Sequence, residues 1–257
     1  MTRVKYTRLL TQSLLALALW LLPASAKAVV LDWDSVNYSS GSFSQSFDID
    51  ASNPGNDITI TISGDTSYFA QNVNDNSNLT GGLSPTQQSL FMNMNYSSES
   101  QSIRVTVTFH YAYGVEDVSF SIFDIDENDS NDSNVGYTDK IALLGKNLSG
   151  TLVAPTTITD SSDNEQVGTG TNRYVRGNDS ASDSSSSGTA SYTFSGTNAI
   201  TEFTFTYGND ANSPNNPGNQ WISLHDITYT PKIPEWHPGL IASFACLMLV
   251  GVRRFFF

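Results

Sequence analysis

Residues 102–125, "SIRVTVTFHYAYGVEDVSFSIFDI", decide the fold class of this 257-residue chain. Apolar and polar residues alternate along residues 102–111 and again along residues 117–125, with a glycine-containing turn between them. Alternation with a period of two is the pattern of β-strands that bury one face, whereas an amphipathic helix repeats every 3.6 residues. The stretch therefore predicts two strands joined by a turn.

The same alternation recurs along most of the chain. The clearest further strands are predicted at residues 57–64, 140–145, 190–196, 199–208 and 220–230, and weaker ones at 29–36, 42–49 and 89–96. Gly-, Pro- and Asn-rich turns separate them. The pattern predicts an all-β fold, an antiparallel two-sheet sandwich of jelly-roll-like type spanning residues 29–231. Residues 160–188 are polar and Ser-rich, and are predicted to form a long mobile loop.

The N-terminal residues 1–28 have the pattern of a secretory signal peptide. Arg3, Lys5 and Arg8 precede an apolar stretch at residues 14–22, and small residues allow cleavage after Ala26 or Ala28. The apolar stretch is shorter than the roughly 20 residues of a membrane span. A cleaved signal helix is therefore favoured over a membrane anchor.

The predicted sandwich domain is strongly acidic. Residues 29–230 include 24 Asp and Glu residues against five Lys and Arg residues, a net charge of −19. This charge repels phosphate backbones, so no nucleic-acid partner is expected, whereas divalent cations are attracted. The one cysteine, Cys246, lies outside the domain, so no disulfide is expected there.

The C-terminal residues 232–257 form a separate segment. Pro234 and Glu235 precede a predicted hydrophobic helix at residues 239–252, which Arg253 and Arg254 follow. Such a helix covers about 21 Å, less than the roughly 30 Å apolar core of a bilayer. The segment is therefore short for a stable span.

This tail resembles the PEP-CTERM sorting signal of bacteria with Gram-negative-type envelopes. It departs from that pattern at Trp236, which stands in place of the second proline, and in the three phenylalanines after the arginines. The resemblance implies processing by an exosortase at the inner membrane, followed by delivery to the cell surface or the extracellular polysaccharide matrix. An uncleaved anchor helix is the alternative.

Residues 120–145 and 207–229 carry a second resemblance. An apolar strand followed by Asp-x-Asp, a variable loop and then Asp-Lys-Ile is similar to a motif of exported bacterial β-sandwich domains. The closing segment "YGNDANSPNNPGNQWISLHDITY" is similar to their last hairpin. The resemblance implies a sandwich fold and leaves the biochemical function open.

Three aspartates are candidates for a structural calcium site. Asp124 and Asp126 alternate at the end of one predicted strand, and Asp139 opens the next. Calcium takes six to eight oxygen ligands, some of which an Asp- and Asn-rich loop could supply as carbonyls. The loop lacks the glycine and flanking helices of an EF-hand. The alternative is a solvated acidic loop with local Asx-turns.

No enzyme motif is present in the sequence. It contains no GxSxG, P-loop, HExxH or GxGxxG pattern, and its three histidines are far apart. We therefore expect a non-enzymatic protein.

Tyr111 and Tyr113 are candidates for ligand binding. Both lie in "HYAYG", where a strand leads into a loop, and loops carry many binding residues. Packing in the core is the more common role for aromatic residues.

The sequence thus supports two hypotheses. The first is a non-enzymatic exported protein of the cell surface or extracellular matrix with a structural or adhesive role. The alternative is a carbohydrate-binding module that recognises the matrix polysaccharide.

Overall fold

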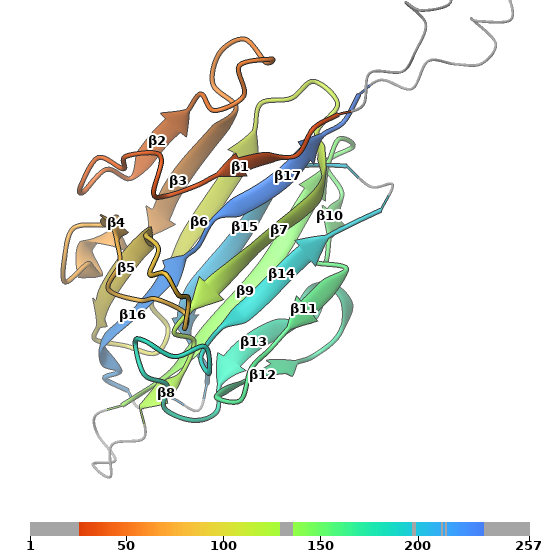
Figure 1. Cartoon of the computed structure of the whole chain (residues 1–257). Coiled ribbons are helices and arrows are strands. Elements are labelled where there is room, and N and C mark those ends of the chain that lie inside the picture. Colours follow the sequence, from red (N-terminus) through yellow and green to blue (C-terminus); the bar gives the residue numbers. More distant parts are fainter. Residues whose placement is uncertain (1–25, 129–135, 197–198, 212, 214, 234–257) are drawn as a thin grey trace, which may run out of the picture. The chain divides into compact units, whose positions relative to one another are not determined.

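The computed structural model of the chain describes residues 26–128, 136–196, 199–211, 213 and 215–233 (Figure 1). In these residues the regular structure consists of β-strands and two 3₁₀ turns, η1 (Thr66–Tyr68) and η2 (Gly170–Asn172). The strand pairs are antiparallel. The predicted all-β, antiparallel fold class is confirmed.

The strands form two groups, which the pairing of Ile200 with Val115 joins into one curled sheet. In the first group, four strands lie side by side in the order β5 (Ser89–Tyr96), β16 (Gly218–Leu224), β7 (Val115–Phe123) and β14 (Ala190–Phe194). Shorter strands extend this group: β4 (Asn74–Asn76) beside β5, β17 (Ile227–Pro231) beside β7, β1 (Val29–Leu31) beside β17, and β11 (Thr157–Thr159) beside β14.

The second group runs across the molecule behind the first in Figure 1. Its order is β2 (Ser44–Phe47), β3 (Ile58–Gly64), β6 (Ser102–Phe109), β15 (Ile200–Asn209), β9 (Tyr137–Asn147), β13 (Tyr174–Gly177) and β12 (Asn164–Val167). The short strands β8 (Glu127–Asn128) and β10 (Leu152–Val153) pair with the two ends of β9. Successive long strands mostly change from one group to the other, which is the pattern of a jelly roll.

One hydrophobic core lies between the two groups. Phe120 of β7 stacks on Phe203 of β15, with ring centroids 4.2 Å apart. Along β6, Ile103, Val105 and Val107 are fully buried, whereas the residues between them face the solvent. Burial of each such side chain stabilises the fold by about 1.5–3 kcal/mol. The alternation read from the sequence therefore gives the second group a polar outer face.

The prediction of a long loop at residues 160–188 is wrong for part of that segment. It contains β12, η2 and β13, and β13 pairs with β9 through Tyr174 and Ala142. The composition is poor in apolar residues, but a short strand near the sheet edge needs little core of its own. Val175 is its one fully buried hydrophobic side chain, and hydrogen bonds to the backbone of β9 hold the strand in place.

The strand predicted at residues 220–230 is also divided in two. β16 ends at Leu224 and β17 starts at Ile227, so His225 and Asp226 lie between them. The backbone N–H of His225 donates to the carbonyl of Ser121 on β7 at 2.9 Å. Both halves therefore remain attached to the same neighbour.

The predicted terminal segments lie almost wholly outside the described residues. This applies to the signal segment except for residues 26–28, and to Pro234, Glu235, Arg253 and Arg254 of the sorting tail. In the part of the chain that the structure describes, no helix has the length and hydropathy needed to cross a membrane.

Candidate functional site

The structure places Tyr111 inside a hydrogen-bond network. Its hydroxyl lies 3.2 Å from Asp50 Oδ2, 3.1 Å from Asp57 Oδ1 and 3.1 Å from the Tyr229 hydroxyl. The two tyrosine rings also meet edge to face, with centroids 5.6 Å apart. Burial, together with the nearby tyrosine and carboxylates, raises the pKa of Tyr111. These contacts give Tyr111 a role in holding the fold together.

Tyr113 is different, because 48% of its surface is exposed. It lies in the turn between β6 and β7, where Gly114 adopts the left-handed backbone that the turn requires. It does not line either of the hollows described below. A binding role for Tyr113 stays a prediction.

The three predicted calcium ligands are brought together at the β8 end of the sandwich. Asp124 and Asp126 follow β7, and Asp139 lies on β9; their exposed fractions are 6%, 4% and 0%. Asp124 has a left-handed backbone with φ of 67°, which turns the chain as it leaves β7. The backbone N–H of Asp139 donates to the Asp126 carbonyl at 2.9 Å. The conformation and hydrogen bonding of the backbone therefore bring the three carboxyl groups close together.

The fold provides partners for some of these carboxyl oxygens. Asp139 Oδ1 accepts a hydrogen bond from the Tyr207 hydroxyl at 3.0 Å, and Asp126 Oδ2 accepts one from the Ala181 N–H at 3.0 Å. The other oxygen of Asp126, Oδ1, is buried and accepts no hydrogen bond of normal geometry, although the Tyr137 hydroxyl lies close enough to lower the pKa of this carboxyl group. A buried acceptor without such a bond costs free energy, which a proton or a cation there would reduce.

Burial raises the pKa values of all three carboxyl groups. Loss of solvent, followed by the charges of Asp126 and Asp183, raises the pKa of Asp124 to about 8. Burial raises the pKa of Asp126 to about 6, although the Ala181 N–H opposes the shift. The pKa of Asp139 lies well above its usual range because the group is completely buried beside the other two. The ionised cluster is therefore unfavourable without a positive partner.

A complete metal-ligand set is not formed by these residues. Among the residues that the structure describes, no three His, Cys, Asp or Glu side chains are arranged to hold a metal ion. Asp129 and Asp132, in the loop between β8 and β9, lie outside the described ranges. The orphaned oxygen of Asp126 fits a cation, while the carboxylates would have to move closer to share one.

A groove lies on the polar outer face of the second group of strands. Its larger hollow, about 440 Å³, lies over β6, β15 and β9 and opens to the solvent. An adjoining hollow of about 200 Å³ shares Ala142 and Thr206 with it. The main lining residues of the larger hollow are Arg104, Thr106, Leu144, Lys146, Leu152, Glu202, Thr204 and Thr206. We call the two hollows together the strand groove.

The strand register arranges the lining residues in rows across the groove. Arg104 of β6 lies opposite Thr206 of β15, which lies opposite Ala142 of β9. The next row is Thr106, Thr204 and Leu144, and the row after it is Thr108, Glu202 and Lys146. The Oγ1 atoms of Thr106 and Thr204 are 3.0 Å apart. Neighbouring strands lie about 4.8 Å apart, so the polar groups that β6 and β15 contribute to each row are separated by about that distance.

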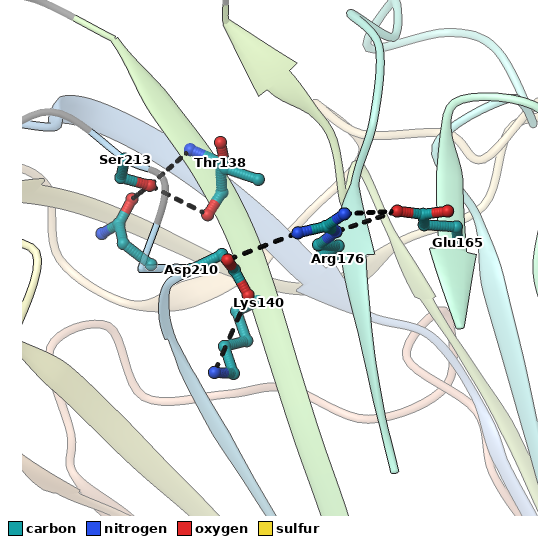
Figure 2. Close-up of polar contacts among 7 residues, drawn as sticks. Thr138, Lys140, Glu165, Arg176, Asp210 and Ser213 are labelled. Carbon is teal, nitrogen blue, oxygen red and sulfur yellow. Dashed lines mark hydrogen bonds and ion pairs between the residues drawn. The ribbon is translucent and has the colours of Figure 1, made fainter. Parts of the chain in front are cut away.

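Charged side chains pair with one another at the edges of the groove. Lys146 Nζ lies 3.4 Å from Glu202 Oε1. Figure 2 shows Asp210 between Arg176 and Lys140, with the Arg176 guanidinium also bound to Glu165. The Arg176 Nη2–Glu165 Oε1 distance is 2.7 Å, and the Arg176 Nη1–Asp210 Oδ1 distance is 3.5 Å.

A second contact in Figure 2 fixes the segment after β15 on β9. The Ser213 hydroxyl accepts a hydrogen bond from the Thr138 N–H at 2.9 Å and faces the Thr138 carbonyl at 3.4 Å. The Asp210 N–H donates to the same carbonyl at 2.9 Å. The carboxylate of Asp210 is therefore positioned by backbone bonds as well as by its cationic neighbours.

Arg104 is the exception among these charged residues. Its side chain is exposed and lines the larger hollow, and no hydrogen bond or ion pair of its guanidinium is found in the described structure. Its neighbours across the strands are Ser63 and Thr206, neither of which carries a charge. The guanidinium is therefore available to a ligand.

The groove was not predicted from the sequence, in which the basic residues are visible only as part of the net charge. Four of the five in the domain lie on one face of the second group: Arg104, Lys140, Lys146 and Arg176. Each is flanked by residues that point into the core. That alternation is a signal for an outward position, but the pairing that gathers them is not visible in one sequence.

Comparisons with known proteins give a limited result. Neither protein-family models nor curated proteins match the chain. Among solved structures, the mannan-recognising carbohydrate-binding module TmCBM27 is 11% identical, with coverage of 82% of this chain and 100% of that one, and a TM-score of 0.37. TmCBM61, solved in complex with β-1,4-galactotriose, is 14% identical over 67% of this chain and 88% of that one, with a TM-score of 0.33. The non-crystalline-cellulose-specific module CBM28 is 8% identical over 61% and 79%, also with a TM-score of 0.33. At these values the similarities do not place the chain in a family.

Proposed function

We propose that the domain is a non-enzymatic module that binds a polysaccharide in the strand groove. The observation that carries this proposal is an open hollow of about 440 Å³ on a hydrogen-bonded sheet, lined by threonine hydroxyls and charged groups. Hydroxyl groups donate and accept hydrogen bonds, as the hydroxyls of a sugar do. Residues on strands hold such groups in fixed positions better than residues on loops.

Binding without catalysis follows from the acids of the groove. Glu202 is the one carboxylate among the residues that line the larger hollow, and it is paired with Lys146. Glycoside hydrolysis commonly uses two carboxyl groups on opposite sides of the bond that breaks. An ion-paired glutamate on an open sheet is instead suited to hydrogen-bonding a sugar.

This proposal joins the two hypotheses drawn from the sequence. In the proposed sequence of events, the signal peptide exports the chain, and the PEP-CTERM-like tail holds it in the inner membrane until an exosortase processes it. The domain then reaches the surface or the matrix, where the groove attaches it to polysaccharide. An adhesive role follows from that attachment. The sorting steps rest on Pro234, Glu235, Arg253 and Arg254 of the sequence.

We also propose that the cluster of Asp124, Asp126 and Asp139 takes up a structural calcium ion. The buried, unpaired Oδ1 atom of Asp126 among carboxyl groups is the observation that favours it. Carboxylate oxygens are ligands that calcium prefers, and its flexible coordination tolerates additional backbone carbonyls and water. Calcium there would neutralise the cluster and hold the end of β7 against β9.

The glycan proposal can be tested with the purified protein and a panel of soluble polysaccharides, by calorimetry. We expect saturable binding to at least one polysaccharide. The double substitution Thr106→Val and Thr204→Val keeps the shape of the groove but removes two hydroxyls, each worth about 0.5–1.5 kcal/mol as a hydrogen bond. We therefore expect a loss of affinity of about tenfold.

Thr193→Val is the matched control, since Thr193 lies on β14 in the other group of strands. It should bind like the unchanged protein, and melting curves should show that all variants are folded. If no polysaccharide binds at millimolar concentration of repeat units, the proposed function is wrong. If the double variant binds as well as the unchanged protein, the groove is not the site.

A further inference from the structure

We propose that the ligand of the strand groove is an acidic polysaccharide, and that Arg104 binds one of its carboxylate groups. This inference rests on the proposed function and names the class of ligand. It follows from the distribution of charge, from the unpaired state of Arg104 and from the lack of aromatic residues in the groove.

The charge of the domain is divided unevenly between its surfaces. Four of its five basic residues lie on the groove face, where they meet four acids: Glu99, Glu165, Glu202 and Asp210. The charges of these eight residues cancel, whereas the domain as a whole carries a net charge of −19. Charges in solution are screened over about 8 Å at physiological salt, so a polyanion responds mainly to the surface that it touches. The groove is the surface on which a polyanion would meet the least repulsion.

Arg104 gives this face an open position for an anion. Lys140, Lys146 and Arg176 are each within ion-pair distance of a carboxylate, whereas Arg104 is exposed and has no partner among the residues that the structure describes. A guanidinium group binds a carboxylate through two parallel hydrogen bonds, which are stronger than bonds between neutral groups. A carboxylate on the ligand therefore supplies the ion-pair partner that Arg104 lacks among the described residues.

The groove offers no ring on which a neutral sugar could stack. Within the described part of the chain, none of the residues that line either hollow is aromatic. Tyr174 lies in the same row as Ala142, but the ammonium group of Lys140 covers its ring at 4.2 Å from the centroid. Small-molecule sites usually combine aromatic or apolar walls with a few polar groups. In this groove, affinity has to come from hydrogen bonds and charge.

The spacing of the cations indicates a polymer rather than a monosaccharide. Arg104 and Lys146 lie on strands on opposite sides of β15 and are two rows apart in the register. Strand spacing and rise per residue put them roughly 16 Å apart. Thr204 lies between them on the diagonal. A chain that follows this diagonal would contact Arg104, the threonine hydroxyls and the Lys146–Glu202 pair together.

The test compares polygalacturonate with a neutral dextran of the same length, using the full protein. We expect at least tenfold tighter binding of polygalacturonate at 150 mM NaCl, and weaker binding at 500 mM NaCl. Arg104→Gln should lower the affinity for polygalacturonate about tenfold, which corresponds to 1.4 kcal/mol. Arg104→Lys keeps the charge but not the paired donors, and should recover only part of the loss.

Arg173→Gln is the matched control. It removes the one basic residue of the domain outside the groove face, whose side chain instead binds the Pro155 carbonyl. Its affinity should equal that of the unchanged protein once melting curves confirm folding. Polyglutamate provides the second control, because it carries carboxylates without sugar hydroxyls and should bind more weakly than polygalacturonate.

The outcomes separate this inference from the proposed function. Preference for a neutral polysaccharide, lost in the Thr106→Val and Thr204→Val variant, would overturn the acidic ligand and leave the proposed function in place. Equal binding of polyglutamate and polygalacturonate would show that charge attraction alone explains the binding of polygalacturonate, and would overturn the inference. If no polysaccharide binds, both proposals fail.

Discussion

The buried acidic cluster and the strand groove show how one strand can create two opposite electrostatic environments. β9 places Asp139 inside the sandwich, completely buried, and places the next residue, Lys140, on the outer face. Successive side chains of a strand point to opposite sides of a sheet. A change of one position in the sequence therefore separates a carboxyl group with no solvent from an ammonium group that remains partly in water.

The two regions differ in the free energy needed to keep a side chain ionised. In the groove, pairs such as Lys146–Glu202 stay partly exposed, and pairs of this kind contribute about 0–1 kcal/mol each. In the cluster, loss of solvent makes the ionised form unfavourable, so the pKa values rise. We expect the cluster to control stability and its pH dependence, and the groove to control binding with little effect on stability.

The largest expected effect is a loss of stability with rising pH when metal is removed. The pKa values of Asp124 and Asp126 are about 8 and about 6 in the folded protein, against about 3.9 for an unfolded aspartate. The folded state therefore keeps protons that the unfolded state has released. This stabilisation is fully present below pH 4 and is lost as the pH rises towards 8. In a chelator, the free energy of unfolding should fall by several kcal/mol across that range, measured by urea denaturation.

Asp124→Asn tests the origin of this slope. The variant cannot ionise at that position, so in chelator it should be more stable than the unchanged protein at pH 8 and equal to it near pH 4. Asp48→Asn removes the same charge at an exposed site and serves as the control. If calcium binds the cluster, a concentration of 100 times its Kd should add about 2.7 kcal/mol at pH 8, and less at pH 5. An unchanged melting temperature with calcium at pH 8 would rule out the proposed ion.

A somewhat smaller effect is expected from removal of the Asp139 carboxyl group. Asp139→Ala leaves the Tyr207 hydroxyl buried without its acceptor and opens a space in a fully buried site. The free energy of unfolding should fall by about 2–3 kcal/mol, as measured by denaturant titration at pH 6. Asp139→Asn keeps an oxygen acceptor of the same size and should cost less than half as much. Equal stability of Asp139→Ala and the unchanged protein would contradict the burial of this group.

The smallest effect on stability is expected in the groove. Glu202→Gln removes the partner of Lys146 at a partly exposed site, so the free energy of unfolding should change by less than about 0.5 kcal/mol. The freed ammonium group should raise the affinity for polygalacturonate about twofold to threefold, as measured by calorimetry. Glu116→Gln is the control, since Glu116 lies on β7 in the other group of strands. A large loss of stability in Glu202→Gln would show that the two regions do not differ as described.

The fold could be predicted from local pattern because inward and outward positions alternate strictly in the long strands. Residues 102–111 and 199–208 were predicted as strands, and the structure has β6 and β15 there. β9 was predicted too short, since it extends from Tyr137 to Asn147. Its first residues include Thr138 and Asp139, which are polar yet buried, so the hydrophobic pattern does not mark them.

The candidate sites differ in the same way. Asp124 and Asp126 are neighbours in the sequence, and Asp139 follows 13 positions after Asp126, so their association could be predicted. The groove could not, because Arg104 and Lys146 come from distant strands that both pair with β15. Tyr111 was a reasonable candidate by its position near a loop, but its hydroxyl binds Asp50, Asp57 and Tyr229.

The sequence by itself determined the all-β class, the main strands, the acidic charge and the pairing of nearby aspartates. These properties depend on composition and on side chains a few positions apart. Only the tertiary structure decided which strands became neighbours, how deeply Asp139 was buried and which bases shared a face. Those features depend on strand register, which is fixed by contacts between residues far apart in the chain. The register of β6 with β15 places the guanidinium of Arg104 beside the threonine hydroxyls of β15.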